Sequence, residues 1–234
     1  MRQIILDTET TGLRIEDGHR IIEIGCLEMV DRKLTGNHFH HFINPEREVE
    51  AGALAVHGLS NEFLHNKPLF KEIVKELMDF ISGAELIIHN APFDLSFLNN
   101  ELLLTRERWK AVADYCNVID TLQLARQMHP GQRNSLDALC KRYGVDNSKR
   151  DLHGALLDAH LLAQVYLAMT GGQGSFFDAA AETRDAQTQS SGTAHTRRIQ
   201  NHKLIIMRAA ETELKDHELY LQLLQKQGKC IWND

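Results

Sequence analysis

Hydrophobic and polar positions along the first 170 residues alternate between the spacing of strands and the spacing of helices. Strand-like apolar runs occupy five segments: Gln3–Asp7, Ile21–Val30, Asn37–Ile43, Leu86–Ile88 and Val118–Asp120. Helical patterns occupy four further segments: 69–81, 93–104, 135–143 and 154–169. An opening run of strands followed by alternating strands and helices predicts an α/β fold with a mixed five-stranded sheet flanked by helices.

The first three strands are close neighbours along the chain. Asp31-Arg32-Lys33 has the composition of a turn between the second and third of them. We therefore expect the chain to open with an antiparallel three-strand meander. For the helix that ends at Tyr143, Ser135 and Asn134 are both candidate N-cap residues.

The pattern changes sharply after Gly171-Gly172. Residues 178–198 are dominated by small and polar residues without apolar periodicity, which is the composition of a linker. Residues 199–234 are apolar again, but a segment below about 40 residues rarely buries enough surface to fold alone. We therefore divide the chain into a domain (1–172), a flexible linker (173–198) and a short helical C-terminal segment (199–234) that folds on a partner.

Composition narrows the classes of function. The 234 residues include 26 Lys and Arg against 32 Asp and Glu, a formal net charge of −6. This balance argues against a protein that holds nucleic acid by charge alone, but it leaves a nucleic-acid enzyme open. We expect a cytoplasmic protein, because no apolar run has the length of a membrane span and the N-terminus lacks the pattern of a signal peptide. The widely spaced cysteines suggest neither a disulfide framework nor a zinc ribbon.

Two acidic residues end the first strand. Asp7 and Glu9 project from the same face, since side chains in a strand alternate with a period of two. No basic residue lies within the motif Asp7–Gly12, and two like charges this close repel each other unless a cation lies between them. Hard divalent cations prefer such oxygen ligands. The pair therefore predicts a metal site, with an exposed strand end as the alternative.

Two further segments carry acids in suggestive positions. Asp94 falls in the first turn of the helix after the strand Leu86–Ile88, and ligands typically bind at the C-terminal ends of such strands. Asp158 lies in the last helix of the domain, five residues after His153. Positions five apart lie about 140° apart around a helix. Both side chains can serve one site only if His153 lies in the loop before the helix, which Gly154 makes easy.

In this order and spacing, the segments resemble the three exonuclease motifs of the DEDDh branch of 3′→5′ exonucleases. More narrowly, they resemble the family of proofreading exonuclease subunits of bacterial DNA polymerase III. The resemblance covers nearly the whole chain and implies a ribonuclease H-like fold. The segments that carry it are Asp7–Gly12, Val56–Gly58, His89–Asp94, Asn134–Cys140, His153–Asp158, Tyr166–Gly172 and Cys230–Trp232.

The resemblance implies a role for each matching residue. Asp7, Glu9, Asp94 and Asp158 are expected to hold two divalent cations, Mg²⁺ or Mn²⁺, about 4 Å apart, as two-metal phosphodiester cleavage requires. His153 is expected to act as the general base that takes the proton of the attacking water, because imidazoles change protonation near neutral pH.

Substrate contacts follow from the same resemblance. His57 lies in the segment where the family contacts the terminal nucleotide, and a plain turn histidine is the alternative. Phe93 and Leu13 are candidate stacking or wedge residues, with core packing as the alternative. Gly52 stands where the family has an acid that contacts the substrate, which leaves that contact open. The expected substrate-binding set is Asp7, Glu9, His57, Asp158 and Phe93.

Other polar residues have simpler interpretations. Asp120 also ends a strand and competes with Asp94 as the third ligand, but we interpret it as structural. Asp137 is expected to cap or pair within its own helix. The histidines His38, His40 and His41 lack a companion motif and are interpreted as the solvated face of one strand.

The tail suggests protein partners. Gln173–Phe177 resembles the short peptide by which replication proteins bind the sliding clamp, with packing on the domain as the alternative. By family resemblance, residues 199–234 bind the catalytic (alpha) subunit of DNA polymerase III, and a small third subunit (theta) binds the exonuclease domain. A flexible linker would raise the effective concentration of the exonuclease near the polymerase.

These observations predict an exonuclease that removes mispaired 3′-terminal nucleotides of DNA as 5′-mononucleotides. Frayed single-stranded ends are the expected substrate, since unpairing costs least at a mismatch. An RNA-trimming exonuclease with the same metals and histidine is one alternative, and the tail argues against it. A non-catalytic scaffold is the other, and the complete set of four acids with His153 argues against that.

Overall fold

The computed structural model describes residues 1–148, 150 and 152–171, together with five isolated residues at 212, 215, 217, 221 and 222. By its internal contacts the chain divides into the units Met1–Ala180 and Ala181–Asp234, and the fold described below lies in the first. The expectations for the segment 173–198, and nearly all of those for 199–234, lie outside the described residues. Within the described part, no helix is long and apolar enough to cross a membrane.

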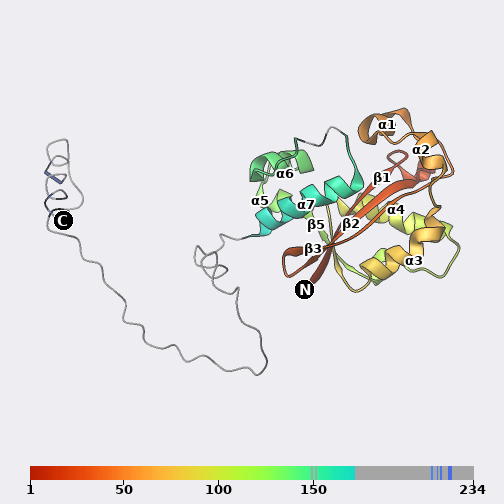
Figure 1. Cartoon of the computed structure of the whole chain (residues 1–234), viewed down its shortest axis with the longest axis horizontal. Helices are drawn as coiled ribbons and strands as arrows, with labels where there is room; N and C mark the ends of the chain where they lie inside the picture. Colours follow the sequence, from red (N-terminus) through yellow and green to blue (C-terminus); the bar gives the residue numbers. More distant parts are fainter. Residues whose placement is uncertain are drawn as a thin grey trace, which may run out of the picture. The chain divides into compact units, whose positions relative to one another are not determined.

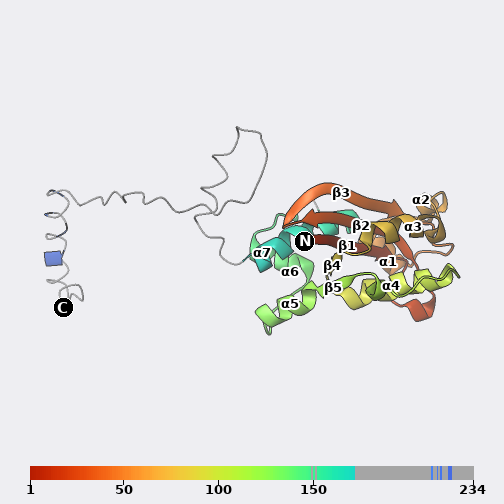
Figure 2. The same cartoon turned by 90° about the horizontal axis from the view of Figure 1, so that it is seen from below.

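A five-stranded sheet runs through the centre of the domain, with helices around it (Figure 1 and Figure 2). The strand order is β3-β2-β1-β4-β5. The pairs β1–β2 and β2–β3 are antiparallel, whereas β1–β4 and β4–β5 are parallel. The prediction of a mixed five-stranded sheet that opens with a meander is therefore confirmed. The strands are β1 (Arg2–Thr10), β2 (Ile21–Val30), β3 (Lys33–Phe42), β4 (Glu85–Ile88) and β5 (Asn117–Asp120).

The helices include three that the apolar pattern did not predict: α1, α2 and α5. They have seven, five and eight residues, and helices this short present at most about two turns of the helical period. The helices are α1 (Ala51–His57), α2 (Asn61–His65), α3 (Phe70–Ile81), α4 (Ala91–Leu104), α5 (Thr121–Met128), α6 (Leu136–Tyr143) and α7 (Ala155–Thr170), with 3₁₀ turns at Ile15–Asp17 and Val112–Asp114.

The third strand begins four residues earlier than its apolar pattern indicates. Only Asp31 and Arg32 form the turn between β2 and β3, and both adopt positive φ angles, 48° and 66°. A two-residue turn of this kind matches the twist of an antiparallel pair. Lys33 can therefore pair directly with Val30.

Alternate side chains of the central strand enter two different apolar layers. Ile4 and Leu6 of β1 belong to the cluster that includes α3 and α4, whereas Ile5 belongs to the cluster that includes α6 and α7. Because the period of a strand is two, Asp7 and Glu9 continue the row of Ile5. Both acids therefore face the side of the sheet that α7 covers.

Helix α7 lies unusually close to the sheet at Gly25, the residue of β2 that pairs with Asp7. A methyl group at Gly25 would lie 2.4 Å from the backbone carbonyl carbon of Ala155 and from the backbone nitrogen of Leu156. Only glycine leaves room for this approach. The close contact holds the first turn of α7, which carries Asp158, against the strand next to β1.

A buried ion pair fixes α4 to the start of β2. The guanidinium of Arg20 donates two parallel hydrogen bonds of 2.7 Å to the carboxylate of Glu101, whose side chain is 1 % exposed. The same carboxylate also accepts the backbone N–H of Ile21 at 3.1 Å. The pair thereby anchors to the sheet the last turn of α4, the helix whose first turn carries Asp94.

Candidate active site

The sequence-predicted acids meet at one cavity of about 590 Å³, which residues of β1, α4 and α7 line together. Asp7 and Glu9 reach it from β1, beyond the last residue that pairs with β4. The shorter β4 leaves the end of β1 open to other elements. The lining includes Asp7, Glu9, Asp94, His153 and Asp158, together with Arg126 and Arg150.

Asp94 enters from the first turn of α4, where the chain leaves β4. Asn90, the N-cap of this helix, adopts a left-handed conformation with φ of 69°, which asparagine tolerates better than most residues. Asp120 stabilises this turn by accepting the backbone N–H of Asn90 at 3.1 Å. The Thr8 hydroxyl, on the other face of β1, donates to Oδ1 of Asp94 at 2.6 Å. Strand and helix together fix the Asp94 carboxylate, which is 3 % exposed.

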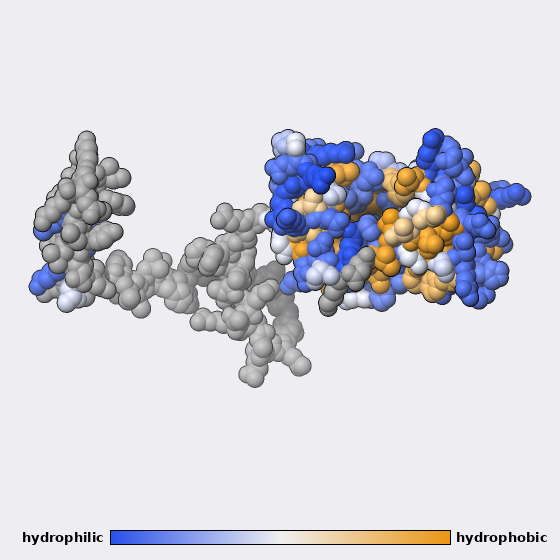
Figure 3. All heavy atoms as spheres, turned by 90° about the horizontal axis from the view of Figure 1, so that it is seen from above, coloured by the Kyte–Doolittle hydropathy of each residue, from blue (hydrophilic) through white to orange (hydrophobic). Residues whose placement is uncertain are grey.

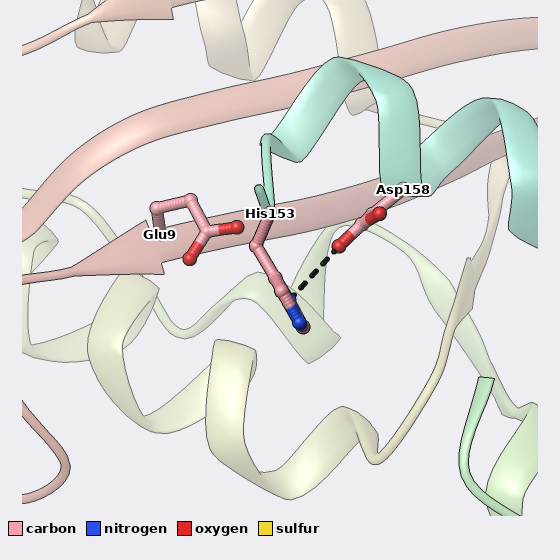
Figure 4. Close-up of side chains that lie close together, drawn as sticks. All are labelled: Glu9, His153 and Asp158. Atoms are coloured by element: carbon pink, nitrogen blue, oxygen red, sulfur yellow. Dashed lines mark ion pairs between the residues drawn. The ribbon is translucent and has the colours of Figure 1, made fainter. Parts of the chain in front are cut away.

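His153 and Asp158 come from the start of α7. Gly154 is the N-cap of the helix and is extended, so His153 lies in the preceding loop. Figure 4 shows Glu9 reaching from β1 towards His153, and Asp158 projecting from the helix beside it. Nδ1 of His153 lies 3.3 Å from Oδ2 of Asp158. The Asp158 side chain is 3 % exposed, whereas the imidazole is 43 % exposed and faces the solvent at the cavity.

Burial, with help from neighbouring carboxylates, raises the pKa values of Asp7, Glu9 and Asp94. Burial, followed by the nearby carboxylates of Asp94, Glu9 and Asp158, holds the pKa of Asp7 well above its ordinary value. Burial and the carboxylates of Asp158 and Glu23 raise the pKa of Glu9 to about 8. Burial raises the pKa of Asp94 to about 7, although the Thr8 hydroxyl opposes the shift. In this arrangement the ionised form of the cluster needs a positive charge close by.

The donor set fits divalent cations. One ligand atom each from Glu9, His153 and Asp158 lies within 4.8 Å of the others. Asp7 and Asp94 contribute further buried oxygens on the same cavity. Oxygen-rich sites with several ionised carboxylates are typical of hard divalent cations.

Arg150 also lines the cavity, although the sequence did not indicate it as a site residue. Its guanidinium donates two hydrogen bonds of 2.5 Å to the two oxygens of Asp158, one of 2.6 Å to Oδ1 of Asp137 and one of 3.0 Å to Nδ1 of His153. Its side chain is only 6 % exposed. Arg150 lies in the loop before α7, where no periodic pattern fixes the direction of a side chain, although His153 and Asp158 are only three and eight residues away.

His57 lies beside the acids, on a second cavity of about 340 Å³. Its Nδ1 accepts the backbone N–H of Leu59 at 3.0 Å, and burial lowers the pKa of the imidazole. Among the described residues, the buried Nε2 atom has no hydrogen-bond partner. A buried polar atom without a partner is costly, so this nitrogen is suited to bind a polar group of a ligand.

The second cavity adjoins an apolar surface. Figure 3 shows apolar side chains gathered on the face of the domain that carries α1. Leu54 and Val56 of α1 are 39 % and 44 % exposed, and Leu13 is 79 % exposed. Phe93 lines both cavities and packs on Phe97 with ring centroids 4.9 Å apart.

Gly52, which stands where the resembled family has an acid, leaves space in the same cavity. A methyl group at this position would meet no heavy atom of the described residues within 4 Å. Gly52 therefore lines the cavity without filling it.

Several other polar residues have structural roles. Asp120 caps α5 by accepting the backbone N–H groups of Leu122 and Gln123, in agreement with its interpretation as a structural residue. The N-cap of α6 is Ser135 rather than Asn134. The expectation that Asp137 pairs within its helix is wrong, because its carboxylate accepts Arg150 from the loop before α7.

The interpretation of the β3 histidines as one solvated face is also wrong. Nε2 of the half-buried His40 lies 2.8 Å from Oε1 of the buried Glu23, the residue that pairs with Glu9. His41 projects from the opposite face of the strand and lies 3.5 Å from Glu76. Only His38 is an exposed residue of the three.

Comparisons with known proteins agree with this geometry. Residues 4–166 match the exonuclease family RNase_T. The DNA polymerase III subunit epsilon of Escherichia coli (strain K12) is 52 % identical over 239 residues, which cover 99 % of this chain and 97 % of the relative. The protein of the same name from Rickettsia felis is 48 % identical over 226 residues, covering 97 % of this chain and 98 % of the relative.

Solved structures of exonucleases share the fold. Exonuclease X in complex with 5′ overhanging duplex DNA is 26 % identical with a TM-score of 0.57, over 71 % of this chain and 90 % of that one. The zinc-bound complex of E. coli exonuclease I with single-stranded DNA has a TM-score of 0.63 at 16 % identity, over 77 % and 43 % of the two chains. The ribonuclease H-like exonuclease fold predicted from the motifs is therefore confirmed. By family match and by identity over nearly its whole length, the chain belongs to the exonuclease family and, within it, to the DNA polymerase III epsilon subunits.

Proposed function

We propose that Asp7, Glu9, Asp94 and Asp158 hold two divalent cations, Mg²⁺ or Mn²⁺, and that His153 is the general base of hydrolysis. Membership of the epsilon subunit family identifies the chain as a proofreading 3′→5′ exonuclease. The roles of the individual residues are our proposal. One observation supports it: four carboxylates from β1, α4 and α7 line one cavity together with a half-exposed imidazole from the loop before α7.

The chemistry follows from the donors. When bound, the cations would acidify the attacking water and neutralise the charge on the leaving oxygen. His153 accepts the proton of that water while the new bond from oxygen to phosphorus forms. The bond between phosphorus and the 3′ oxygen of the penultimate nucleotide breaks. A 5′-mononucleotide leaves, and the strand keeps a 3′-hydroxyl. The exposure of the imidazole lets it return its proton to solvent.

We propose that the 340 Å³ cavity receives the terminal nucleotide. The unpartnered Nε2 of His57 supports this, since a sugar hydroxyl or base edge would satisfy it. Phe93, between the two cavities, offers a ring on which the terminal base can stack. Selection of mispaired ends then follows from the lower cost of unpairing them, without reading of the base.

The test is a purified full-length protein on labelled oligonucleotides. The substrates are DNA with a matched or a mismatched 3′ end and single-stranded RNA, each with Mg²⁺, with Mn²⁺ and with a chelator. We expect 5′-mononucleotides from DNA, faster from the mismatched end, and no hydrolysis with the chelator. Preferential degradation of RNA would favour a trimming exonuclease, and no hydrolysis with either metal would indicate a scaffold.

We further propose three partners for this polymerase III subunit. Residues 199–234 bind the catalytic alpha subunit, Gln173–Phe177 binds the sliding clamp, and a theta-like small subunit binds the domain 1–172. The names of relatives matched over 97 % or more of their length support association with the polymerase, and this setting implies a cytoplasmic location. Deletion of 199–234 should leave nuclease activity intact and abolish copurification with alpha. Retained copurification would refute that assignment.

A further inference from the structure

Arg150 occupies the position in the site where positive charge is most needed. Its guanidinium forms a fork with both oxygens of Asp158 at 2.5 Å, and it also donates to Nδ1 of His153 at 3.0 Å. It is one of the charges that act on Asp7 and Glu9 as well. The geometry is that of a built-in counter-ion for the carboxylate cluster.

This arrangement conflicts with the metal-holding role proposed for Asp158. An arginine donates hydrogen bonds and has no lone pair for a metal. Both oxygens of Asp158 are committed to Arg150, and so is the lone pair of the His153 Nδ1 atom. A cation can therefore take Asp158 only if the guanidinium releases it.

The released guanidinium needs a new acceptor. Its side chain is 6 % exposed, and a buried charged group that loses its partner is strongly destabilised. Asp137, at 59 % exposure, retains one N–H by its 2.6 Å hydrogen bond and keeps the group at the cavity. A phosphodiester brought to the same carboxylates presents two oxygens that match the arginine fork.

We propose that Arg150 exchanges partners during the catalytic cycle. Without cations it clamps Asp158 and His153, and when cations take Asp158 it binds a phosphate of the DNA 3′ end. This inference rests on the proposed function of the site. It assigns two roles to Arg150. The arginine weakens metal binding by competing for Asp158, and it strengthens DNA binding by contacting a phosphate.

The exchange predicts effects of opposite sign in one variant. In full-length Arg150→Gln, Mn²⁺ binding measured by calorimetry should be about 10-fold tighter than in the wild type, because the competing donor is gone. DNA binding at saturating Mn²⁺ should be about 10- to 100-fold weaker, with a salt slope lower by about 1. The DNA probe is a single-stranded oligonucleotide with a 3′-terminal phosphorothioate linkage, which keeps the charge and slows hydrolysis.

Two control variants separate the exchange from general charge effects and from damage to the fold. Arg126→Gln removes the same charge from the same cavity, outside the hydrogen-bond network of Arg150, and should tighten Mn²⁺ binding much less. Arg150→Lys keeps the charge without the fork and should lie between wild type and Arg150→Gln in both measurements.

The outcomes are distinguishable. Weaker or unchanged Mn²⁺ binding in Arg150→Gln, or unchanged DNA binding, would overturn the exchange. If wild-type protein bound no Mn²⁺ and hydrolysed no DNA, the proposed function itself would fail. A misfolded variant would lose affinity for both Mn²⁺ and DNA. Tighter Mn²⁺ binding together with weaker DNA binding therefore excludes misfolding, and circular dichroism provides an independent check.

Discussion

The backbone N–H of His153 donates to the carbonyl oxygen of Val56 at 3.0 Å. This hydrogen bond joins the loop that carries the proposed base to the last turn of α1. His57 directly follows Val56 in that turn. A second contact lies beside it, because Leu152 packs over Gly58, the left-handed C-cap of α1. The loop that carries the proposed base and the helix that lines the proposed nucleotide pocket are thus in direct contact.

Gly58→Ala should therefore slow catalysis from outside the cavity. Gly58 has a φ of 72°, and a methyl group there would lie 2.6 Å from Cδ1 of Leu152. The loss of rate requires that relief of this contact shifts the backbone at Leu152 and with it His153, rather than only rotating the Leu152 side chain; small displacements of a catalytic group can cost up to about 100-fold in rate. We expect a 10- to 100-fold lower kcat in single-turnover assays on DNA, with Mn²⁺ affinity close to that of the wild type.

A double-mutant cycle tests the cause. Leu152→Ala removes the atom with which the new methyl group collides. If the clash displaces His153, then Gly58→Ala should cost much less in the Leu152→Ala background. Equal losses in both backgrounds would mean that the strained backbone at Gly58, rather than the contact, is responsible.

Removal of a proposed ligand should abolish hydrolysis. Asp7→Ala and Asp158→Ala each delete a carboxylate from the site, and neither strand nor helix offers a replacement. His153→Ala should cost about 10² to 10⁴ in rate, the usual contribution of a general base. The rates are measured by release of the labelled terminal nucleotide at saturating Mg²⁺. Turnover like that of the wild type in Asp7→Ala would refute the proposed site.

The metal-free protein should lose stability as the pH rises. The carboxyls of Glu9 and Asp94 titrate at about 8 and about 7 in the fold, against 4.5 and 3.8 ordinarily. Between these values the folded state binds more protons than the unfolded state, so the free energy of unfolding falls with increasing pH. We expect a lower Tm at pH 8.5 than at pH 5.5 in a chelator.

Two comparisons isolate this effect. Mn²⁺ should offset the loss of stability increasingly towards high pH, because the cation binds the deprotonated carboxylates. Glu9→Gln should show a shallower decline in the chelator, since the variant lacks one titrating group. A Tm that rises with pH in the wild type, with the same slope in Glu9→Gln, would contradict the raised pKa of Glu9.

The Arg20–Glu101 pair should be a large single contribution to stability. Arg20→Met leaves the buried carboxylate of Glu101 without its partner, which costs about 3–5 kcal/mol in comparable pairs. Urea denaturation measures the change. The control is Lys75→Met, since the Lys75–Asp79 pair is 80 % and 67 % exposed and such pairs contribute less than about 1 kcal/mol. Equal effects of the two variants would rule out the special role of the buried pair.

The sequence predicted the parts of the site that local periodicity determines. Strand alternation placed Asp7 and Glu9 on one face, and the strand-to-helix junction placed Asp94 at the end of the sheet. Gly154 indicated that His153 precedes the helix that carries Asp158. Each of these inferences needs only a few neighbouring residues, because a regular element fixes the direction of its side chains.

Contacts between distant segments were beyond such reasoning. The motif of Asp7 and Glu9 contains no basic residue, yet the fold supplies Arg150 from the loop before α7. Asp137 pairs with that same arginine, although the helical pattern suggested a partner within α6. Likewise, nothing in the alternation of β3 reveals that His40 meets the buried Glu23. These pairs depend on how side chains of different elements and loops meet, which the pattern within a single element does not encode.

The missing side chain at Gly25 has a consequence for inheritance. Helix α7 rests on this glycine, so any side chain at position 25 would lift the helix and its carboxylate away from β1. The residue belongs to an interior strand and is not among the residues that line either cavity. A change there should nevertheless weaken proofreading. The accuracy of copying therefore depends on a position that a survey of cavity-lining residues would overlook.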